Sequence, residues 1–135
     1  MIADHRLQRP GVERRKFGRL GRDDLLFVDT SHVCKTGGDV PWIYDEILPR
    51  LAPGVLVHMH DVCLPGDYPP AWVLDGWGWH EIYLVHAFLA FNPAFAVRFS
   101  SPVMVLRRRD ALLPTFPGYA DHEGRAGSSL WIPSL

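Results

Sequence analysis

Two short apolar runs in this chain each end abruptly in carboxylate and imidazole side chains. The first run is Asp24–His32 (DLLFVDTSH) and the second is Gly54–Asp61 (GVLVHMHD). Runs of this kind are typical of buried parallel strands, and in open α/β sheets ligands bind beyond the carboxyl ends of the strands. We therefore expect the polar side chains that end the two runs to share one crevice. These are Asp29, His32, His60 and Asp61.

The stretch between the two runs has the pattern of a crossover helix. Its apolar residues recur every three or four positions, which is the spacing of one helical face. Asp39 stands where an N-cap is expected, and Pro53 and Gly54 end the helix. The pattern predicts a βαβ unit. The apolar face of its helix consists of Val40, Ile43, Ile47, Leu48 and Leu51.

The size and charge of the chain exclude several classes of protein. It has 135 residues, of which 47% are hydrophobic and 21% charged, with a formal net charge of −1. This is the composition of one ordinary globular domain, and it does not indicate a nucleic-acid partner. No apolar run reaches the roughly 18 residues that a membrane span requires, and the first residues lack the apolar stretch of a signal peptide. We therefore expect a cytoplasmic protein with no membrane partner.

Basic residues are concentrated at the start of the chain. Seven of the 14 Lys and Arg residues precede Asp23. These residues form either a solvated surface or a contact for an anion. We therefore divide the chain into a basic, largely irregular segment (residues 1–22) and an α/β domain (residues 23–135). The two cysteines, Cys34 and Cys63, are too few for a disulfide scaffold and are expected to be reduced.

The rest of the chain supplies a long loop and several further elements. Residues 62–78 are rich in Pro, Gly and Trp, which favours an ordered lid over the crevice. In residues 102–113 the apolar start favours a strand and the remainder a helix, and we assign a helix. The elements expected after the lid are a helix over Trp79–Phe91, a strand over Phe95–Ser100, the helix over Pro102–Leu113 and a last strand over Ser128–Ile132.

Asp29, His60 and Asp61 carry oxygen and imidazole donors that suit a divalent ion such as Mg²⁺. The alternative is turn chemistry, because an Asp at the end of a strand often accepts backbone N–H bonds. His32 follows Asp29 by three residues and is a candidate general base for a hydroxyl substrate, or else a hydrogen-bonded bystander. Because parallel strands are usually covered on both faces, we expect His58 to be a core residue.

Four segments resemble class I S-adenosylmethionine-dependent methyltransferases. Residues 26–32 (LFVDTSH), 48–54 (LPRLAPG) and 57–61 (VHMHD) resemble the family's fourth strand, the following helix and the fifth strand, and Ser128–Ile132 resembles its final antiparallel strand. The most similar group ends these strands with F-[IV]-D-x-x-H and H-D, and includes metal-dependent O-methyltransferases of hydroxylated small molecules. The resemblance implies a partial Rossmann-like sheet, strands 4 to 7 with their flanking helices, without the N-terminal half.

The resemblance also implies roles for individual residues. It places Asp29 and Asp61 at metal- or substrate-binding positions and His32 close to the methyl-transfer region. We expect Asp29 and Ser31 to contact the cofactor, and Asp29, His60 and Asp61 to hold the metal. The glycine-rich loop and the acidic residue with which the family binds S-adenosylmethionine have no counterpart here. We therefore expect the C-terminal, substrate-side portion of a methyltransferase, inactive alone, with a small-molecule hydroxyl substrate.

Two other classes of function stay open. A non-catalytic interaction module would use strand Asp24–Val28 as an exposed sheet edge, which predicts self-association. A metal-dependent hydrolase would gather its side chains around one ion, although no metallohydrolase motif is present. Its ligands would be Asp29, His32, His60 and Asp61.

Overall fold

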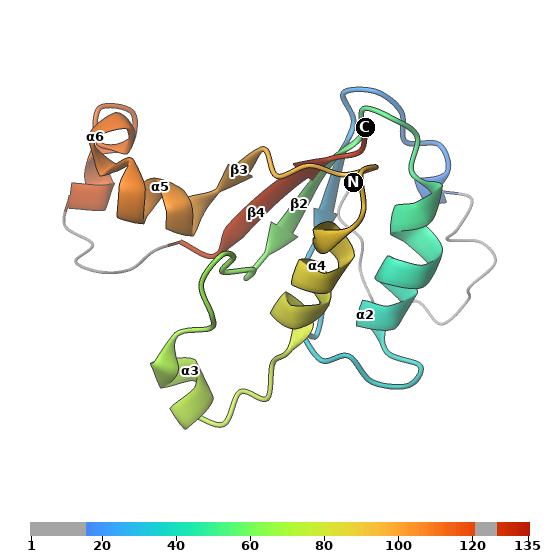
Figure 1. The fold of residues 1–135 in the computed structure, drawn as a ribbon, viewed down its shortest axis with the longest axis horizontal. Helices are drawn as coiled ribbons and strands as arrows, with labels where there is room; N and C mark the ends of the chain where they lie inside the picture. The colour runs from blue at the N-terminus through green and yellow to red at the C-terminus, as the bar shows by residue number, and fades with distance from the viewer. Residues whose placement is uncertain (1–15, 121–126) are drawn as a thin grey trace.

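The computed structural model describes residues 16–120 and 127–135, and its centre is a four-stranded mixed sheet (Figure 1). The strands are β1 (Leu25–Val28), β2 (Leu56–His60), β3 (Phe99–Ser100) and β4 (Ser129–Pro133). β1 and β2 are parallel, β4 is antiparallel to β2, and β3 is antiparallel to β4, in the order β1-β2-β4-β3. The α/β class and the parallel pair predicted from the two apolar runs are confirmed.

One continuous helical segment joins β1 to β2, as predicted. It consists of α2 (Asp39–Trp42), a π-helical turn (Ile43–Ile47) and a 3₁₀ turn (Leu48–Arg50). The predicted N-cap at Asp39 is wrong, because the cap position falls on Gly38. The Asp39 carboxylate instead accepts hydrogen bonds from the backbone N–H and the hydroxyl of Ser31, both at 2.6 Å. Asp39 therefore ties the start of the crossover to the loop after β1.

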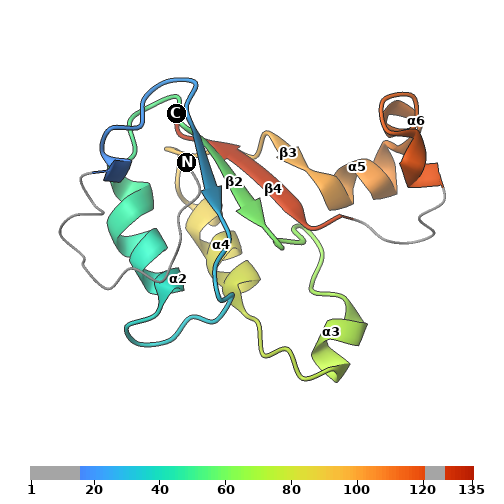
Figure 2. The same cartoon turned by 180° about the vertical axis from the view of Figure 1, so that it is seen from behind.

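The sheet buries one of its faces completely. The crossover and α4 (Glu81–Ala90) pack against this face (Figure 1). Figure 2 shows the opposite face of β1, β2 and β4 without a helix in front of it. His58 lies on this second face and is half-exposed, so its expected place in the core is wrong. The strand residues on the buried face are Leu26, Val28, Val57, Met59, Leu130 and Ile132.

The other predicted elements are present, with changed lengths. The lid contains a short helix, and β3 covers only the last two residues of the strand predicted over 95–100. The segment 102–113 is helical, as two helices that meet at Arg108. Phe17 and Leu20 are buried against the core, whereas residues 1–15 of the basic segment lie outside the described residues. The elements are α3 (Pro70–Leu74), α5 (Ser101–Arg107), α6 (Arg109–Leu112) and a 3₁₀ turn (Pro117–Ala120).

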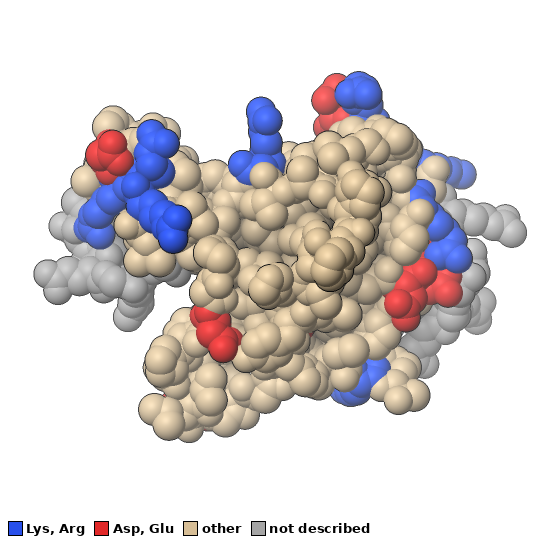
Figure 3. All heavy atoms as spheres, viewed as in Figure 1, with Lys and Arg blue, Asp and Glu red and all other residues tan. Residues whose placement is uncertain are grey.

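Charged side chains lie mainly around the rim of the face that carries α4 (Figure 3). A basic group lies over α5 and α6, where Arg107, Arg108 and Arg109 follow one another. Within residues 16–120 and 127–135, no helix has the length and apolar character needed to cross a bilayer.

A pair of neighbouring leucines tests the one-sided core. Leu26 is fully buried, so Leu26→Ala should lower the free energy of unfolding by about 2–5 kcal/mol. Leu25 is 40% exposed, so Leu25→Ala should cost less than about 1 kcal/mol. Urea denaturation followed by tryptophan fluorescence measures both values, and equal losses would contradict a core on one face only.

Candidate functional site

The carboxyl ends of β1 and β2 bring the predicted side chains together. Asp29 Oδ1 lies 3.7 Å from His32 Nε2 and 3.7 Å from His60 Nδ1. His60 Nδ1 is also 3.3 Å from Asp61 Oδ2. The Asp29 carboxylate therefore stands between two imidazoles, and the predicted convergence of the four side chains is confirmed.

Two of these residues hold their backbone in the left-handed region. The φ angle is 57° at His32 and 54° at Asp61, a conformation that costs a non-glycine residue about 1–3 kcal/mol and is concentrated at functional sites. The His32 N–H donates to Thr30 Oγ1 at 3.0 Å, and the Asp61 carboxylate accepts a hydrogen bond from the Ser128 hydroxyl. Both parallel strands thus lead into strained turns that carry a titratable side chain.

The His32 imidazole is enclosed by protein. The residue is 3% exposed, its Nδ1 lies 2.9 Å from Glu81 Oε2, and its ring centroid is 4.1 Å from that of Trp79. The Asp29 side chain, in contrast, is 52% exposed. A molecule that approaches from solvent therefore meets Asp29 before it meets His32.

Glu81, the first residue of α4, belongs to the site although the sequence pattern did not indicate it. Its carboxylate is 2% exposed and accepts hydrogen bonds from the Thr30 hydroxyl and, at 3.2 Å, from the Tyr44 hydroxyl. Burial and then the charge of Glu81 raise the pKa of Tyr44 well above its ordinary value, so this hydroxyl keeps its proton and donates. A glutamate in a first helical turn is ordinary helix chemistry, which is why its burial leaves no signal in the sequence.

Backbone hydrogen bonds join the same two segments. The N–H groups of His80 and Glu81 donate to the His32 carbonyl oxygen at 3.0 and 3.2 Å. The first N–H groups of a helix have no partners within the helix, so His32 supplies the acceptor that α4 needs at its start. The loop after β1 is therefore fixed to α4 through both its backbone and the His32 ring.

Ser31, the predicted cofactor contact, is already engaged by the protein. Its backbone N–H and its hydroxyl both donate to Asp39. Burial acts to raise the pKa of Asp39, but the hydrogen bonds from Ser31 and from the backbone N–H groups of Asp39 and Val40 together outweigh this effect and hold the pKa below its ordinary value. The Asp39 carboxylate therefore stays charged and holds the loop that carries Asp29 and His32.

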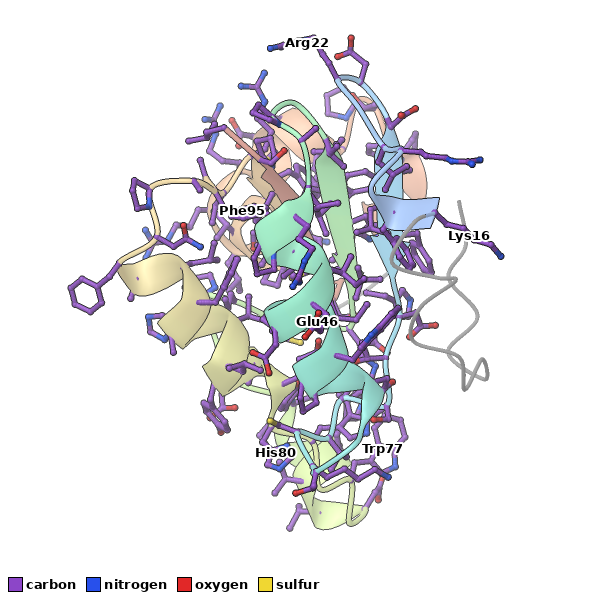
Figure 4. The ribbon with its side chains drawn as sticks, turned by 90° about the vertical axis from the view of Figure 1, so that its right-hand side faces the viewer. Lys16, Arg22, Glu46, Trp77, His80 and Phe95 are labelled. Carbon is purple, nitrogen blue, oxygen red and sulfur yellow. The ribbon has the colours of Figure 1, made fainter. Side chains whose placement is uncertain are left out.

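Aromatic rings in and next to the predicted lid (residues 62–78) contact one another. Their centroids lie between 4.7 and 6.2 Å apart. The Tyr68 hydroxyl accepts a hydrogen bond from the Ile82 N–H at 3.2 Å, and burial raises the pKa of Tyr68. Figure 4 shows Trp77 and His80 at the end of the molecule opposite Arg22. The four rings belong to Tyr68, Trp72, Trp77 and Trp79.

The open face of the sheet carries a second group of aromatic side chains. The His58 and Trp131 rings stack with centroids 4.1 Å apart and an interplanar angle of 6°. Phe27 meets the other side of His58 at 5.0 Å, and His58 Nε2 is hydrogen-bonded to the Ser129 hydroxyl. Burial, and then the charge of His60, lower the pKa of His58.

The side chains predicted to bind a metal ion lie near one another but do not form a complete set of ligands. Among the described residues, no group of three or more His, Cys, Asp or Glu side chains could hold a metal ion. His60 Nδ1 is nevertheless buried without a hydrogen-bond partner in the part of the chain that the structure describes. The Mg²⁺ site at Asp29, His60 and Asp61 stays a prediction.

Comparisons with family models, with curated proteins and with solved structures give no match to this chain. The functional interpretation therefore depends on the order of the strands and on the geometry at their carboxyl ends.

Stability should fall when the pH is lowered through the titration of His58. The folded chain holds the pKa of His58 below its ordinary value of 6.5, so the unfolded chain takes up the proton first and protonation favours unfolding. The contribution of neutral His58 is complete above pH 6.5 and is lost as the pH falls through the lower, folded-state pKa. His58→Gln should therefore flatten the decline in free energy of unfolding between about pH 7 and 5, measured by urea denaturation.

The matched control is His86→Gln, which changes an exposed histidine on α4 and should keep the parental pH dependence. The same slope in the parent and in His58→Gln would contradict a depressed pKa at His58.

Proposed function

We propose that this chain is the acceptor-side portion of a class I S-adenosylmethionine-dependent O-methyltransferase that acts on a small hydroxylated molecule. The support is the parallel β1–β2 pair with antiparallel β4 beside β2, which is the arrangement that the resembling segments imply. The observation that carries the proposal is the exposed Asp29 carboxylate between the imidazoles of His32 and His60 at the carboxyl ends of the two strands.

The residues around this carboxylate do not fit the cofactor-binding half of such an enzyme. β1 is followed by Asp-Thr-Ser-His and β2 by Asp-Val-Cys, and neither is a glycine-rich turn of the kind that binds a nucleotide cofactor. Ser31 donates to Asp39 instead of facing a ligand. We therefore derive no methyl-transfer step and assign only the handling of the acceptor to this chain.

The geometry is suited to binding a hydroxyl group and removing its proton. The acceptor hydroxyl donates a hydrogen bond to Asp29, which is the exposed group of the cluster. The proton passes to the Asp29 carboxylate and from there to His32 Nε2, which lies 3.7 Å behind Asp29 Oδ1 and is the final base. Removing the proton makes the acceptor oxygen a stronger nucleophile, and holding it in a fixed direction supplies the positioning on which a displacement reaction depends.

Catechol, a small dihydroxylated probe, should bind at the carboxyl ends of β1 and β2. In an NMR titration the amide signals of residues 29–32 and 60–61 should shift. Asp29→Asn should weaken binding about tenfold, because a hydrogen bond to a charged group contributes roughly 1.5–3 kcal/mol. Asp45→Asn changes an exposed carboxylate on the crossover and should bind like the parent. No shift at millimolar catechol, or shifts elsewhere, would refute the acceptor site.

S-adenosylmethionine itself should bind weakly or not at all to this chain, because no cofactor loop follows either parallel strand. Isothermal titration calorimetry measures this directly. A dissociation constant in the low micromolar range would overturn the acceptor-side assignment, since the described residues would then form a cofactor site by themselves.

A second candidate function, an interaction module, is favoured by the position of β1. Among the described strands, β1 is the terminal one, and its described neighbour is β2. Parallel strands normally lie inside a sheet, and an edge strand can act as a template for pairing with another chain. The half-buried Phe27 ring lies on the open face beside this edge.

The chain should therefore self-associate through β1 as its concentration rises. Phe27→Lys places a charge beside the edge and should shift the population toward the monomer, as charged residues do on natural edge strands. Phe91→Lys makes the same change at a side chain that is 96% exposed on the far end of α4 and should associate like the parent. Light scattering over a range of concentrations measures both, and a parent that stays monomeric throughout would exclude this interface.

A further inference from the structure

The Glu81 carboxylate is a buried group for which the acceptor chemistry described above gives no role. It is 2% exposed, and three side chains surround it. Tyr44 donates to Oε1, while the Thr30 hydroxyl and the His32 ring meet Oε2. Thr30 Oγ1 itself accepts from the His32 backbone N–H, so the Thr30 hydroxyl hydrogen is free to point at Glu81. Each Glu81 oxygen therefore accepts a hydrogen bond from a hydroxyl group, and Oε2 is also the atom that faces the His32 ring.

This arrangement decides which ring nitrogen of His32 carries the proton. A neutral imidazole has one N–H donor and one acceptor nitrogen, and the partner of one nitrogen selects the tautomer. Nδ1 lies 2.9 Å from a carboxylate oxygen that only accepts, so Nδ1 must be the donor. Nε2 lies 3.7 Å from Asp29 Oδ1, which is too long for a hydrogen bond. In the neutral ring Nε2 is therefore the nitrogen without a proton.

The same contact also fixes the direction of the ring. His32 is held on three sides: by Glu81 at Nδ1, by the Trp79 ring at 4.1 Å, and through its carbonyl oxygen by the N–H groups of His80 and Glu81. A ring held in this way keeps Nε2 turned toward the exposed Asp29 carboxylate. In serine proteases a buried carboxylate performs the corresponding task for the catalytic histidine.

We propose that Glu81 is a positioning residue that holds His32 in the Nδ1–H tautomer and so makes Nε2 the proton-accepting atom of the site. The tautomer follows from the contacts alone. The transfer of an acceptor's hydroxyl proton to Nε2 rests on the proposed function. In that transfer the proton leaves the hydroxyl oxygen for the Asp29 carboxylate and then leaves Asp29 to form a bond to Nε2, so that Asp29 is again ionised and the acceptor is an oxyanion.

The tautomer can be measured on the parent chain without a substrate. With ¹⁵N-labelled histidine, long-range ¹H–¹⁵N correlation spectra at mildly alkaline pH distinguish the protonated nitrogen of each ring from the unprotonated one. His32→Gln identifies the signals of His32 by their loss. We expect a protonated Nδ1 and an unprotonated Nε2, and the opposite tautomer in the parent would overturn the proposal.

Two variants of Glu81 and one control separate this role from general stability. Glu81→Gln keeps an acceptor oxygen and should keep the Nδ1–H tautomer, whereas Glu81→Met removes the acceptor and should give the Nε2–H form. Glu46→Gln makes the same carboxylate-to-amide change at the crossover, where Glu46 pairs with Arg50, and should leave the His32 spectrum unchanged. An unchanged tautomer in folded Glu81→Met would refute the role, and if that variant does not fold, the parent spectrum still decides.

The outcomes for Glu81 and for the proposed function are distinguishable. Loss of catechol binding at residues 29–32 with an intact Nδ1–H tautomer would refute the acceptor site and leave the positioning role standing. An Nε2–H tautomer together with catechol binding at Asp29 would refute the positioning role alone.

Discussion

The contact between His32 and Glu81 connects the parts of the molecule that matter for its chemistry. It joins the loop after β1 to the start of α4 through a ring-to-carboxylate hydrogen bond and through the two backbone bonds to the His32 carbonyl. Because Tyr44 of the crossover and Thr30 donate to the same carboxylate, three segments distant in sequence meet at one buried group. An unpaired buried carboxylate would be strongly destabilising, so each donor depends on the others being in place.

The one-sided sheet gives the molecule two different surfaces. The crossover and α4 cover the face that holds Leu26, Met59 and Ile132, and the core is continuous there. The other face leaves imidazole and indole rings half-exposed at His58 and Trp131. Parallel sheets are usually covered on both faces. Among the described strands, β1 therefore combines an open face with the terminal position in the sheet.

Much of this architecture follows from local pattern. The sequence predicts the parallel pair, the crossover helix and the last strand because their apolar periodicity agrees with the tertiary packing. The antiparallel direction of the last strand is what the resemblance implies. The approach of Asp29, His32, His60 and Asp61 followed from the parallel direction of the strands alone. Glu81 could not be found in this way, because a helix-initiating glutamate looks the same whether it is exposed or buried. The exposure of His58 was missed for a related reason: one strand's sequence does not reveal whether a second layer covers its other face.

The left-handed backbone at His32 and Asp61 sets the chemistry of this site against the stability of the chain. Glycine is the residue that adopts this conformation without strain. A substitution by glycine at either turn would relieve the backbone strain but would remove the imidazole or the carboxylate. Selection for stability alone would therefore be expected to erase these side chains first. At the ends of both parallel strands, an imidazole or a carboxylate therefore occupies a backbone conformation in which glycine would be less strained.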